Sequence, residues 1–381
     1  MRKICIVTPP HYLSETFIRA HEEFLPGEKK VLTGNFPNYY YRDHHIVTQY
    51  NRHNRFRRFL KCLPQALYER MVPKGAYEKQ AAHASLEEFF EEESIDVILA
   101  EYGMTGADIT PLAKRHNIPL VVHFHGHDAY NRDYLKAYES RFEAMFEYAM
   151  TIISVSKSMT EQLLKLGAKS EQIQLNPYGP RDHFFELKPN HRKLQLIAIG
   201  RFVDMKAPYI TLAAFNQALE TCPDARLIMV GDGDLRQACI NLAEGWGILD
   251  RVEFPGALTH EHTRKLLEES RAFVQHSVQE KNGVCEGTPV AILEAGASAL
   301  PVIATRHAGI SQAVIHESTG LLVEERDLQG MAQHMAQILK NKNLARELGQ
   351  GARKHIQENF SIERHLSNLQ TIIESAASSH Q

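Results

Sequence analysis

The sequence lacks the features that mark several large classes of protein. It has no apolar run near the roughly 20 residues that cross a bilayer, so we expect any membrane contact to be peripheral. Lys and Arg (43) nearly balance Asp and Glu (46), and the formal net charge of -3 gives no whole-chain argument for nucleic-acid binding. The five cysteines show neither paired nor metal-type spacing, which is typical of reduced thiols in a cytoplasmic protein.

Short apolar segments alternate with amphipathic ones along the chain. They predict strands at 3–8, 30–32, 97–100, 120–123 and 151–155, then at 194–200, 226–231, 252–254, 272–275, 301–304 and 320–323. The first run is too short for a signal peptide and indicates a buried strand. Helical segments fall between the strands. This alternation predicts an α/β protein with parallel sheets and right-handed crossovers.

The chain is long enough for two domains, and the best boundary is the segment from Asn176 to Pro189, which contains Pro turns and little periodicity. We therefore predict an N-terminal domain at 1–180 and a second domain at 190–360. The remainder, 361–381, reads as a last helix over 362–375 with a frayed tail.

The most informative stretch is Glu286-Gly-Thr-Pro-Val-Ala-Ile-Leu-Glu294. Thr288 is a good N-cap and Pro289 suits the first helical position, so a helix is predicted to begin here. Glu286 then precedes the helix and Glu294 lies inside it, with free N–H groups between them that suit a phosphate. Such a site fits a nucleotide-sugar, with one carboxylate on sugar hydroxyls and the other on ribose hydroxyls. Cys285 is either a nucleophile or, more simply, a packed thiol.

This pattern resembles the Glu-x7-Glu signature of retaining, family-four-type glycosyltransferases with two Rossmann-like domains facing a central cleft, the GT-B architecture. Two glutamates at this spacing also occur by chance on charged surface helices. The surrounding Gly287-Thr-Pro and the later Leu300-Pro-Val-Ile-Ala-Thr305 make the resemblance more specific. The resemblance also implies that the final helix crosses back to the first domain.

A second motif supports the same interpretation. Arg201 and Lys206 lie on a loop between a predicted strand and a helix starting at Pro208. Bidentate Arg and mobile Lys suit a diphosphate, although a solvated basic loop is the alternative. In the similar family this pair neutralises the leaving pyrophosphate in place of a divalent metal, which implies no metal and no cofactor.

Val230-Gly-Asp-Gly-Asp234 follows another predicted strand. A dinucleotide fingerprint is weak here because Arg236 takes the third glycine position. A metal-binding Asp-x-Asp is disfavoured against ordinary turn chemistry. The family carries Gly-Asp-Gly at this place, so Gly231 is assigned to donor binding.

Three histidines end a first-domain strand, in His123-Phe-His125-Gly-His127-Asp128. Ligands bind at this edge of parallel sheets. The spacing fits a metal, but one loop cannot establish a metal site and no further ligand set is evident. In similar enzymes one histidine lies beside the transferred sugar, and His125 matches it best. Asp128 is either an acceptor-side contact or a helix cap.

Two features concern the acceptor side. Ser14-Glu15-Thr16-Phe17 stands where many relatives have a Gly-Gly loop, and it resembles a subset tied to bacterial exopolysaccharide and capsule synthesis; a simple helix cap is the alternative. The segment 52–63 interleaves basic and apolar residues. It fits an anionic membrane surface, where lipid-linked acceptors reside, or a helix packed on its own domain; nothing else supports a nucleic-acid partner.

Together these features imply a metal-independent retaining glycosyltransferase, a hexosyltransferase by resemblance. It would move sugar from a UDP- or GDP-sugar to a glycan or lipid-linked acceptor in bacterial cell-surface polysaccharide synthesis, in the cytoplasm or on the inner membrane face. The alternatives are an epimerase on the same fold and a non-catalytic nucleotide-sugar-binding subunit. The catalytic candidates are Glu286, His125, Arg201 and Lys206. The donor-binding candidates are Arg201, Lys206, Gly231, Glu286, Gly287, Thr288, Pro289 and Glu294. The acceptor-side candidates are Ser14, Glu15 and Asp128.

Overall fold

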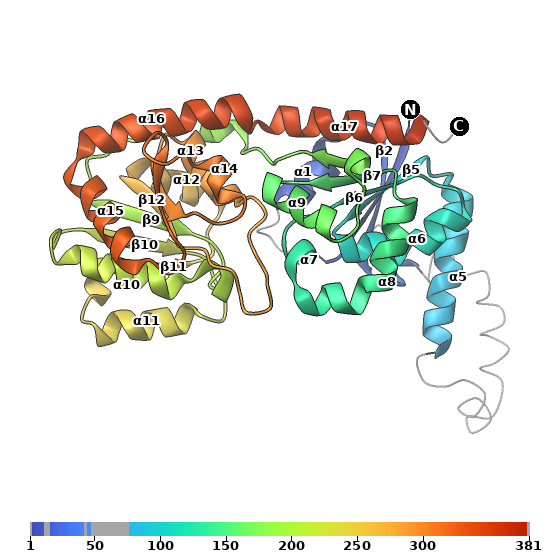
Figure 1. Cartoon of the computed structure of the whole chain (residues 1–381), viewed down its shortest axis with the longest axis horizontal. Coiled ribbons are helices and arrows are strands. Elements are labelled where there is room, and N and C mark those ends of the chain that lie inside the picture. The colour runs from blue at the N-terminus through green and yellow to red at the C-terminus, as the bar shows by residue number, and fades with distance from the viewer. Residues whose placement is uncertain (1, 11–15, 42–43, 47–75, 379–381) are drawn as a thin grey trace, which may run out of the picture.

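The computed structural model describes residues 2–10, 16–41, 44–46 and 76–378. It contains two sheets, one in each half of the chain, each flanked by helices (Figure 1). The predicted α/β class with two Rossmann-like units is therefore confirmed.

The first sheet has the strand order β4-β3-β2-β1-β5-β6-β7-β8. Its strands are β1 Lys3–Thr8, β2 Glu28–Asn35, β3 Asn38–Tyr41, β4 His44–His45, β5 Val97–Glu101, β6 Leu120–His123, β7 Thr151–Ser154 and β8 Ile173–Leu175. Every pairing from β2 to β8 is parallel. The central strands β5 and β6 are buried at every residue, which explains their unbroken apolar character.

The antiparallel edge of this sheet, β3 and β4, was not among the predicted strands. Its sequence is rich in Tyr and His rather than aliphatic residues, so apolar periodicity gave a weak signal. The short β8 was missed too, because two of its three residues are exposed.

Helices cover both faces of the first sheet. They are α1 Thr16–Phe24, α5 Ala76–Glu93, α6 Gly103–Arg115, α7 His127–Tyr130, α8 Arg132–Tyr148 and α9 Lys157–Lys165, with short 3-10 turns at Ser170–Gln172 and Asp182–Phe184. Asn131 caps α8 through its side-chain oxygen, and Ser156 caps α9 in the same way.

The second sheet is parallel throughout, with the order β11-β10-β9-β12-β13-β14. Its strands are β9 Gln195–Ile199, β10 Arg226–Val230, β11 Val252–Gly256, β12 Ala272–Gln275, β13 Val302–Thr305 and β14 Gly320–Val323. Its helices are α10 Pro208–Leu219, α11 Arg236–Gly245, α12 His260–Glu269, α13 Val290–Ala297, α14 Ile310–Ala313, α15 Leu328–Lys340 and α16 Lys342–Asn359, with 3-10 turns at Asp204–Lys206 and Leu249–Arg251.

The final helix α17, Ile362–Ser378, returns to the first sheet along the same side as α16 (Figure 1). Leu369 and Ile373 pack into a buried cluster with Ile6, Leu99 and Val121 from β1, β5 and β6. The predicted crossing of this helix is confirmed.

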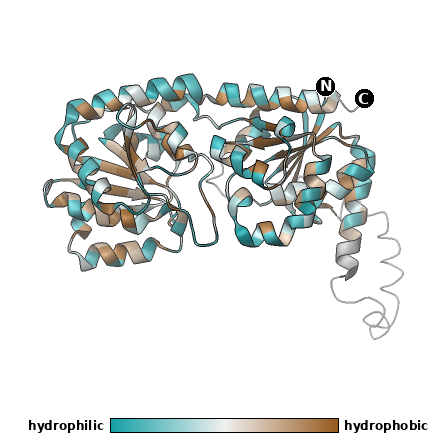
Figure 2. Cartoon of the chain, in the orientation of Figure 1, coloured by the Kyte–Doolittle hydropathy of each residue, from teal (hydrophilic) through white to brown (hydrophobic). Residues whose placement is uncertain are grey.

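Apolar residues concentrate in the strands and on the inner faces of the helices, and hydrophilic residues lie on the outside (Figure 2). Within the described part of the chain, no helix combines the length and apolar character needed to cross a membrane.

Candidate functional site

A hollow in the second half of the chain lies at the carboxyl ends of β9, β10 and β12, where parallel sheets bind ligands. Gly200, Arg201, Lys206 and Gln275 are among its lining residues. Arg201 is exposed, and among the described residues its guanidinium has no hydrogen-bond or ion-pair partner. Its positive charge is therefore free for an anionic ligand.

Lys206 and Glu286, predicted to act together, are in direct contact. Lys206 Nζ lies 2.6 Å from Glu286 Oε1, and the side chains are 15% and 6% exposed. The same oxygen accepts hydrogen bonds from Ser277 Oγ at 2.9 Å and Gln275 Nε2 at 3.2 Å. Glu286 Oε2 has no partner within the described residues, so this oxygen is the one available to a ligand hydroxyl.

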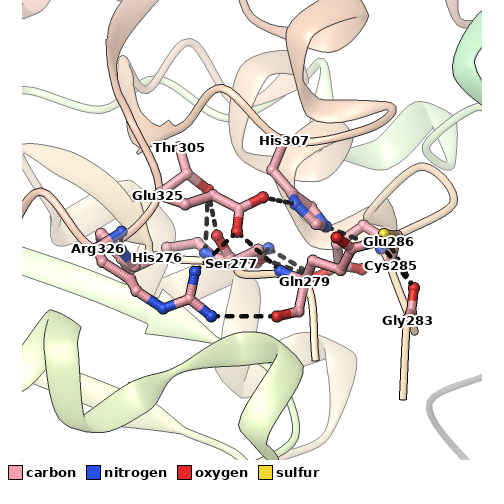
Figure 3. A network of polar contacts seen from close by, with 11 residues as sticks. His276, Ser277, Gln279, Gly283, Cys285, Glu286, Thr305, His307, Glu325 and Arg326 are labelled. Atoms are coloured by element: carbon pink, nitrogen blue, oxygen red, sulfur yellow. Dashed lines mark hydrogen bonds and ion pairs between the residues drawn. The ribbon is translucent and has the colours of Figure 1, made fainter. Parts of the chain in front are cut away.

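The loop that carries Glu286 is held by polar contacts (Figure 3). The backbone N–H of Glu286 donates to His307 Nε2 at 3.1 Å, and His307 Nδ1 bonds Glu325 Oε1 at 2.6 Å. Glu325 Oε2 also accepts from the N–H of Gln279 at 2.9 Å. These contacts fix the carboxylate position through its backbone.

Cys285 is a packed thiol and not an activated nucleophile. Its Sγ–H contacts the carbonyl oxygen of Gly283 at 3.3 Å (Figure 3). Burial raises the pKa of the Cys285 thiol to about 11, so the thiolate is scarce at neutral pH.

The helix after Glu286 begins one residue later than predicted. α13 starts at Val290 with Pro289 as its N-cap, and no side chain caps it. Thr288 does not cap the helix, because its hydroxyl donates to the carbonyl oxygen of Val155 at 2.8 Å, in the first half of the chain. The hydroxyl therefore ties the two halves together across the cleft.

Gly287 lies in the tightest part of this contact. A Cβ at Gly287 would lie 2.3 Å from the carbonyl oxygen of His125, closer than any side chain can approach. A glycine is needed here because the loop before α13 packs directly on the loop after β6. The N–H of Lys157 also donates to Gln312 Oε1 at 2.7 Å, which is a further contact between the two halves of the chain.

Glu294 lines a second pocket, separate from the hollow that Arg201 and Lys206 line. This second pocket is lined by residues of both halves, including Phe17, Tyr178, Arg181, Glu294 and His365. Burial raises the pKa of Glu294 to about 8, and the charge of Arg181 opposes this only in part. The predicted contact of Glu294 with the ribose stays a prediction.

Gly231 allows the close approach of two strand ends. It has φ of 134°, and a Cβ there would lie 1.9 Å from the carbonyl oxygen of Gly200. Its N–H donates to the carbonyl oxygen of Gly256 at 2.9 Å. The residue therefore shapes the floor of the first hollow.

His125 lies in a buried polar network. Its Nε2 bonds Glu101 Oε2 at 2.8 Å, its Nδ1 bonds the Tyr178 hydroxyl, and its side chain is 3% exposed. Both ring nitrogens of His125 therefore have partners within the protein. The group of His125 that lies against Gly287 is its backbone carbonyl oxygen. The predicted position of this ring beside the transferred sugar stays a prediction.

Asp128 also has a buried structural position. Its carboxylate accepts from the N–H groups of Gly103 at 2.8 Å, His125 at 3.0 Å and Gly126 at 2.9 Å. These contacts fix the start of α6 and the loop after β6 together. The carboxylate therefore anchors this loop and the start of the preceding helix α6, and its predicted acceptor-side contact stays a prediction.

Sequence reasoning missed the residues that surround His125 and His123. Glu101 ends β5, His21 comes from α1 and His365 from α17, and all are at most 1% exposed. Burial raises the pKa of Glu101, but the charge of His21 and hydrogen bonds from neighbouring histidines outweigh it and hold that pKa well below its usual value. Burial lowers the pKa of His123 to about 3. The one available signal was a glutamate directly after an apolar strand.

Ser14, Glu15 and the basic segment 52–63 lie outside the described residues. Their predicted acceptor and membrane roles therefore stay predictions.

Known proteins are similar to this chain in sequence and in fold. The chain matches the sequence model for Glycosyltransferase Family 4 over residues 42–179 and that for Glycosyl transferases group 1 over residues 181–355. It is 28% identical to WcaL of Escherichia coli (strain K12), named as a glycosyltransferase of colanic acid biosynthesis, over 72% of this chain and 70% of that protein. The Erwinia amylovora amylovoran biosynthesis glycosyltransferase AmsK is 27% identical, over 62% of this chain and 60% of AmsK.

Solved structures agree on the fold. Anabaena HepE in complex with UDP has a TM-score of 0.75 at 15% identity, covering 98% of this chain and all of that one. Sucrose-phosphate synthase from Thermosynechococcus elongatus has a TM-score of 0.73 at 18% identity, covering all of both chains. From the family matches and the two-sheet architecture together, the chain belongs to the family-four glycosyltransferases of the GT-B type.

Proposed function

We propose that the protein transfers a sugar, a hexose by family resemblance, from a nucleotide-diphosphate sugar to a glycan or lipid-linked acceptor, with retention of anomeric configuration. The observation that carries the proposal is the contact of Lys206 Nζ with Glu286 Oε1 at 2.6 Å beside the exposed Arg201. One carboxylate oxygen and one guanidinium are left for a ligand, as a sugar linked to a diphosphate requires.

The donor's diphosphate would lie between Arg201 and the start of α13. Arg201 offers paired donors, Lys206 offers a point charge, and the helix start offers backbone N–H groups. Arg201 also lies close enough to His127 that its charge adds to the effect of burial in lowering the pKa of that histidine. Positive groups therefore line the cleft on the face where the leaving diphosphate would develop charge, and a divalent metal would not be needed there.

Glu286 Oε2 would hold a hydroxyl of the transferred sugar, and Glu294 would hold the ribose. The second role requires the nucleoside to reach the pocket lined by Arg181 and Glu294. The carbonyl oxygen of His125 faces Gly287, next to Glu286, and would accept a hydrogen bond from a second hydroxyl of the transferred sugar.

The acceptor would enter from the first half of the chain, and the setting is bacterial cell-surface polysaccharide synthesis. The names of WcaL and AmsK support this setting. UDP in complex with HepE supports a UDP-sugar ahead of a GDP-sugar. A cytoplasmic location, with peripheral contact through 52–63, completes the proposal.

The proposal is tested first by thermal shift with UDP, GDP, ADP, TDP and CMP, with and without EDTA. We expect one diphosphate to raise the unfolding temperature of the wild type by an amount that EDTA does not change. Glu294→Ala should lose this response, and Glu269→Ala, a surface glutamate paired with Lys193, should keep it. No response to any nucleotide would refute the donor site.

Turnover then separates the alternatives. With the identified sugar nucleotide, product analysis distinguishes transfer to an acceptor from epimerisation of the donor and from binding without turnover. NMR of the new linkage reports its anomeric configuration. Arg201→Ala should lower turnover more than nucleotide affinity, since its charge acts on the departing diphosphate.

A further inference from the structure

A second group of chemically active side chains adjoins the second pocket, which we call the interface pocket because residues of both halves line it, His365 among them. His21, Glu101, His123 and His365 come from α1, β5, β6 and α17, and each is at most 1% exposed. One ligand atom from each of His21, Glu101 and His123 lies within 4.8 Å of the other two. Three of these groups therefore surround one buried point, and His365 joins them through its contact with His21.

The hydrogen-bond partners determine where the ring protons lie. His21 Nδ1 is 2.7 Å from Glu101 Oε1, and His365 Nδ1 is 3.1 Å from the carbonyl oxygen of Pro177. A carboxylate and a carbonyl only accept, so both Nδ1 atoms carry the proton. Without a further proton or a metal ion, both Nε2 atoms bear lone pairs, yet they face each other at 2.8 Å. Two facing lone pairs call for a cation between them.

The surroundings of His123 distinguish between the two candidate cations, a shared proton and a metal ion. Its Nδ1 points to Glu101 Oε2 at 3.5 Å, and neither ring nitrogen has a hydrogen-bond partner within the described residues. A proton shared by His21 and His365 would leave His123 unsatisfied, at a cost of about 1–3 kcal/mol for each buried polar group. A metal ion accepts lone pairs from all three rings, and Glu101 balances its charge.

The spacing suits zinc with small adjustment. Zinc binds imidazole nitrogen at about 2.0–2.1 Å, which puts two ligand nitrogens of a tetrahedral site roughly 3.3 Å apart and their ring centres roughly 5 Å apart. The ring centres of His21, His123 and His365 are 5.1, 5.3 and 5.9 Å apart. The 2.8 Å contact needs to open by only about half an ångström.

We propose that His21, His123 and His365 bind one Zn²⁺ ion through Nε2, with Glu101 as the carboxylate that orients His21 and His123. Imidazole ligands suit zinc, and ring N–H groups held by a carboxylate or a backbone carbonyl are the usual outer contacts of such ligands. His365 also lines the interface pocket, which gives the ion a route of entry. The ion fastens α17 to the first sheet and is separate from the proposed diphosphate site.

The test uses the full chain, purified without a polyhistidine tag, incubated with ZnCl₂ and dialysed against metal-free buffer. We expect about one zinc per chain by mass spectrometry of metals. His123→Gln and His365→Gln should retain less than about a tenth of that amount. His191→Gln is the matched control, because His191 is equally buried and bonds a backbone carbonyl outside the cluster.

Stability provides the second readout. EDTA should lower the unfolding temperature of wild type and His191→Gln, and leave His365→Gln unchanged. If the wild type contained no zinc and its unfolding temperature did not change with EDTA, the zinc site would be overturned. The contact between His21 and His365 would then be explained by a shared proton. If a variant does not fold, the metal content and EDTA response of the wild type still decide. The nucleotide response is measured as a difference at fixed EDTA, so failure of zinc binding is distinct from failure of the donor site.

Discussion

The contact between Lys206 and Glu286 supports a quantitative prediction about both stability and turnover. Lys206→Met removes the ammonium with little loss of volume, and Glu286→Gln removes the carboxylate charge. Breaking one side of a buried ion pair costs about 3–5 kcal/mol. Glu286 Oε1 keeps Ser277 and Gln275 as donors, so we expect each single change to lower the free energy of unfolding by about 2 kcal/mol.

The double variant carries no unpaired charge at this place, so it should lie within about 1 kcal/mol of the wild type. The double change thus costs roughly 3 kcal/mol less than the sum of the two single changes. This coupling energy is at the upper end for residues in contact. Urea unfolding measures it, with fluorescence of Trp246 as the reporter. Trp246 is the single tryptophan of the chain and lies in the same half as the pair.

Turnover should behave differently from stability. Either single change should lower kcat about 10²–10³-fold, and the double variant should not recover, because both groups are assigned contacts with the donor. Stability effects that simply add would show that the contact carries no energy. Wild-type turnover in Lys206→Met would refute the assignment of Lys206 to the leaving diphosphate.

Three further predictions follow from single contacts. Gly287→Ala should lower turnover at least about tenfold with a small loss of stability. The new Cβ would collide with the carbonyl oxygen of His125 at 2.3 Å and hold the two halves apart. Turnover equal to that of the wild type would show that the contact is dispensable. Glu294 binds a proton in the folded state up to a pKa of about 8, so wild-type stability should fall by up to a few kcal/mol as pH rises from about 4.5 to 8. Glu294→Gln should remove that fall in melts at pH 5–9, and parallel profiles would contradict the raised pKa. Cys285→Ser should keep the wild-type rate of turnover with the identified sugar nucleotide, and inactivity with intact folding would reinstate a catalytic thiol.

The approach of Lys206 to Glu286 could be expected from the sequence because both residues lie on strand-to-helix connections at one edge of a parallel sheet, while their donor roles stay predictions. Glu286 and Glu294 lie within nine residues, and Arg201 and Lys206 within six. One strand-to-helix connection therefore carries each pair, and the strand edge that holds them follows from a parallel sheet. The helix start was misplaced by one residue, because Thr288 has a partner in the other half that no local pattern reveals.

The histidine cluster could not be predicted for the opposite reason. His21 and His365 are 344 residues apart, and their contact depends on α17 returning to the first sheet. The three histidines after β6 indicated a metal or a sugar contact, but the other ligands come from segments with no distinctive pattern. Spacing within one loop cannot report ligands supplied by tertiary packing.

The placement of residues 286–288 links domain closure to assembly of the site. Gly287 packs on His125, and Thr288 donates to Val155, so this short loop joins the two halves of the chain. The same loop carries Glu286, whose carboxylate contacts Lys206 and is proposed to hold the sugar. Opening the cleft would break the first two contacts and move the loop that fixes Glu286. Closure that excludes water would therefore also complete the charge arrangement, and a donor bound to the open form would lack the geometry for transfer or hydrolysis.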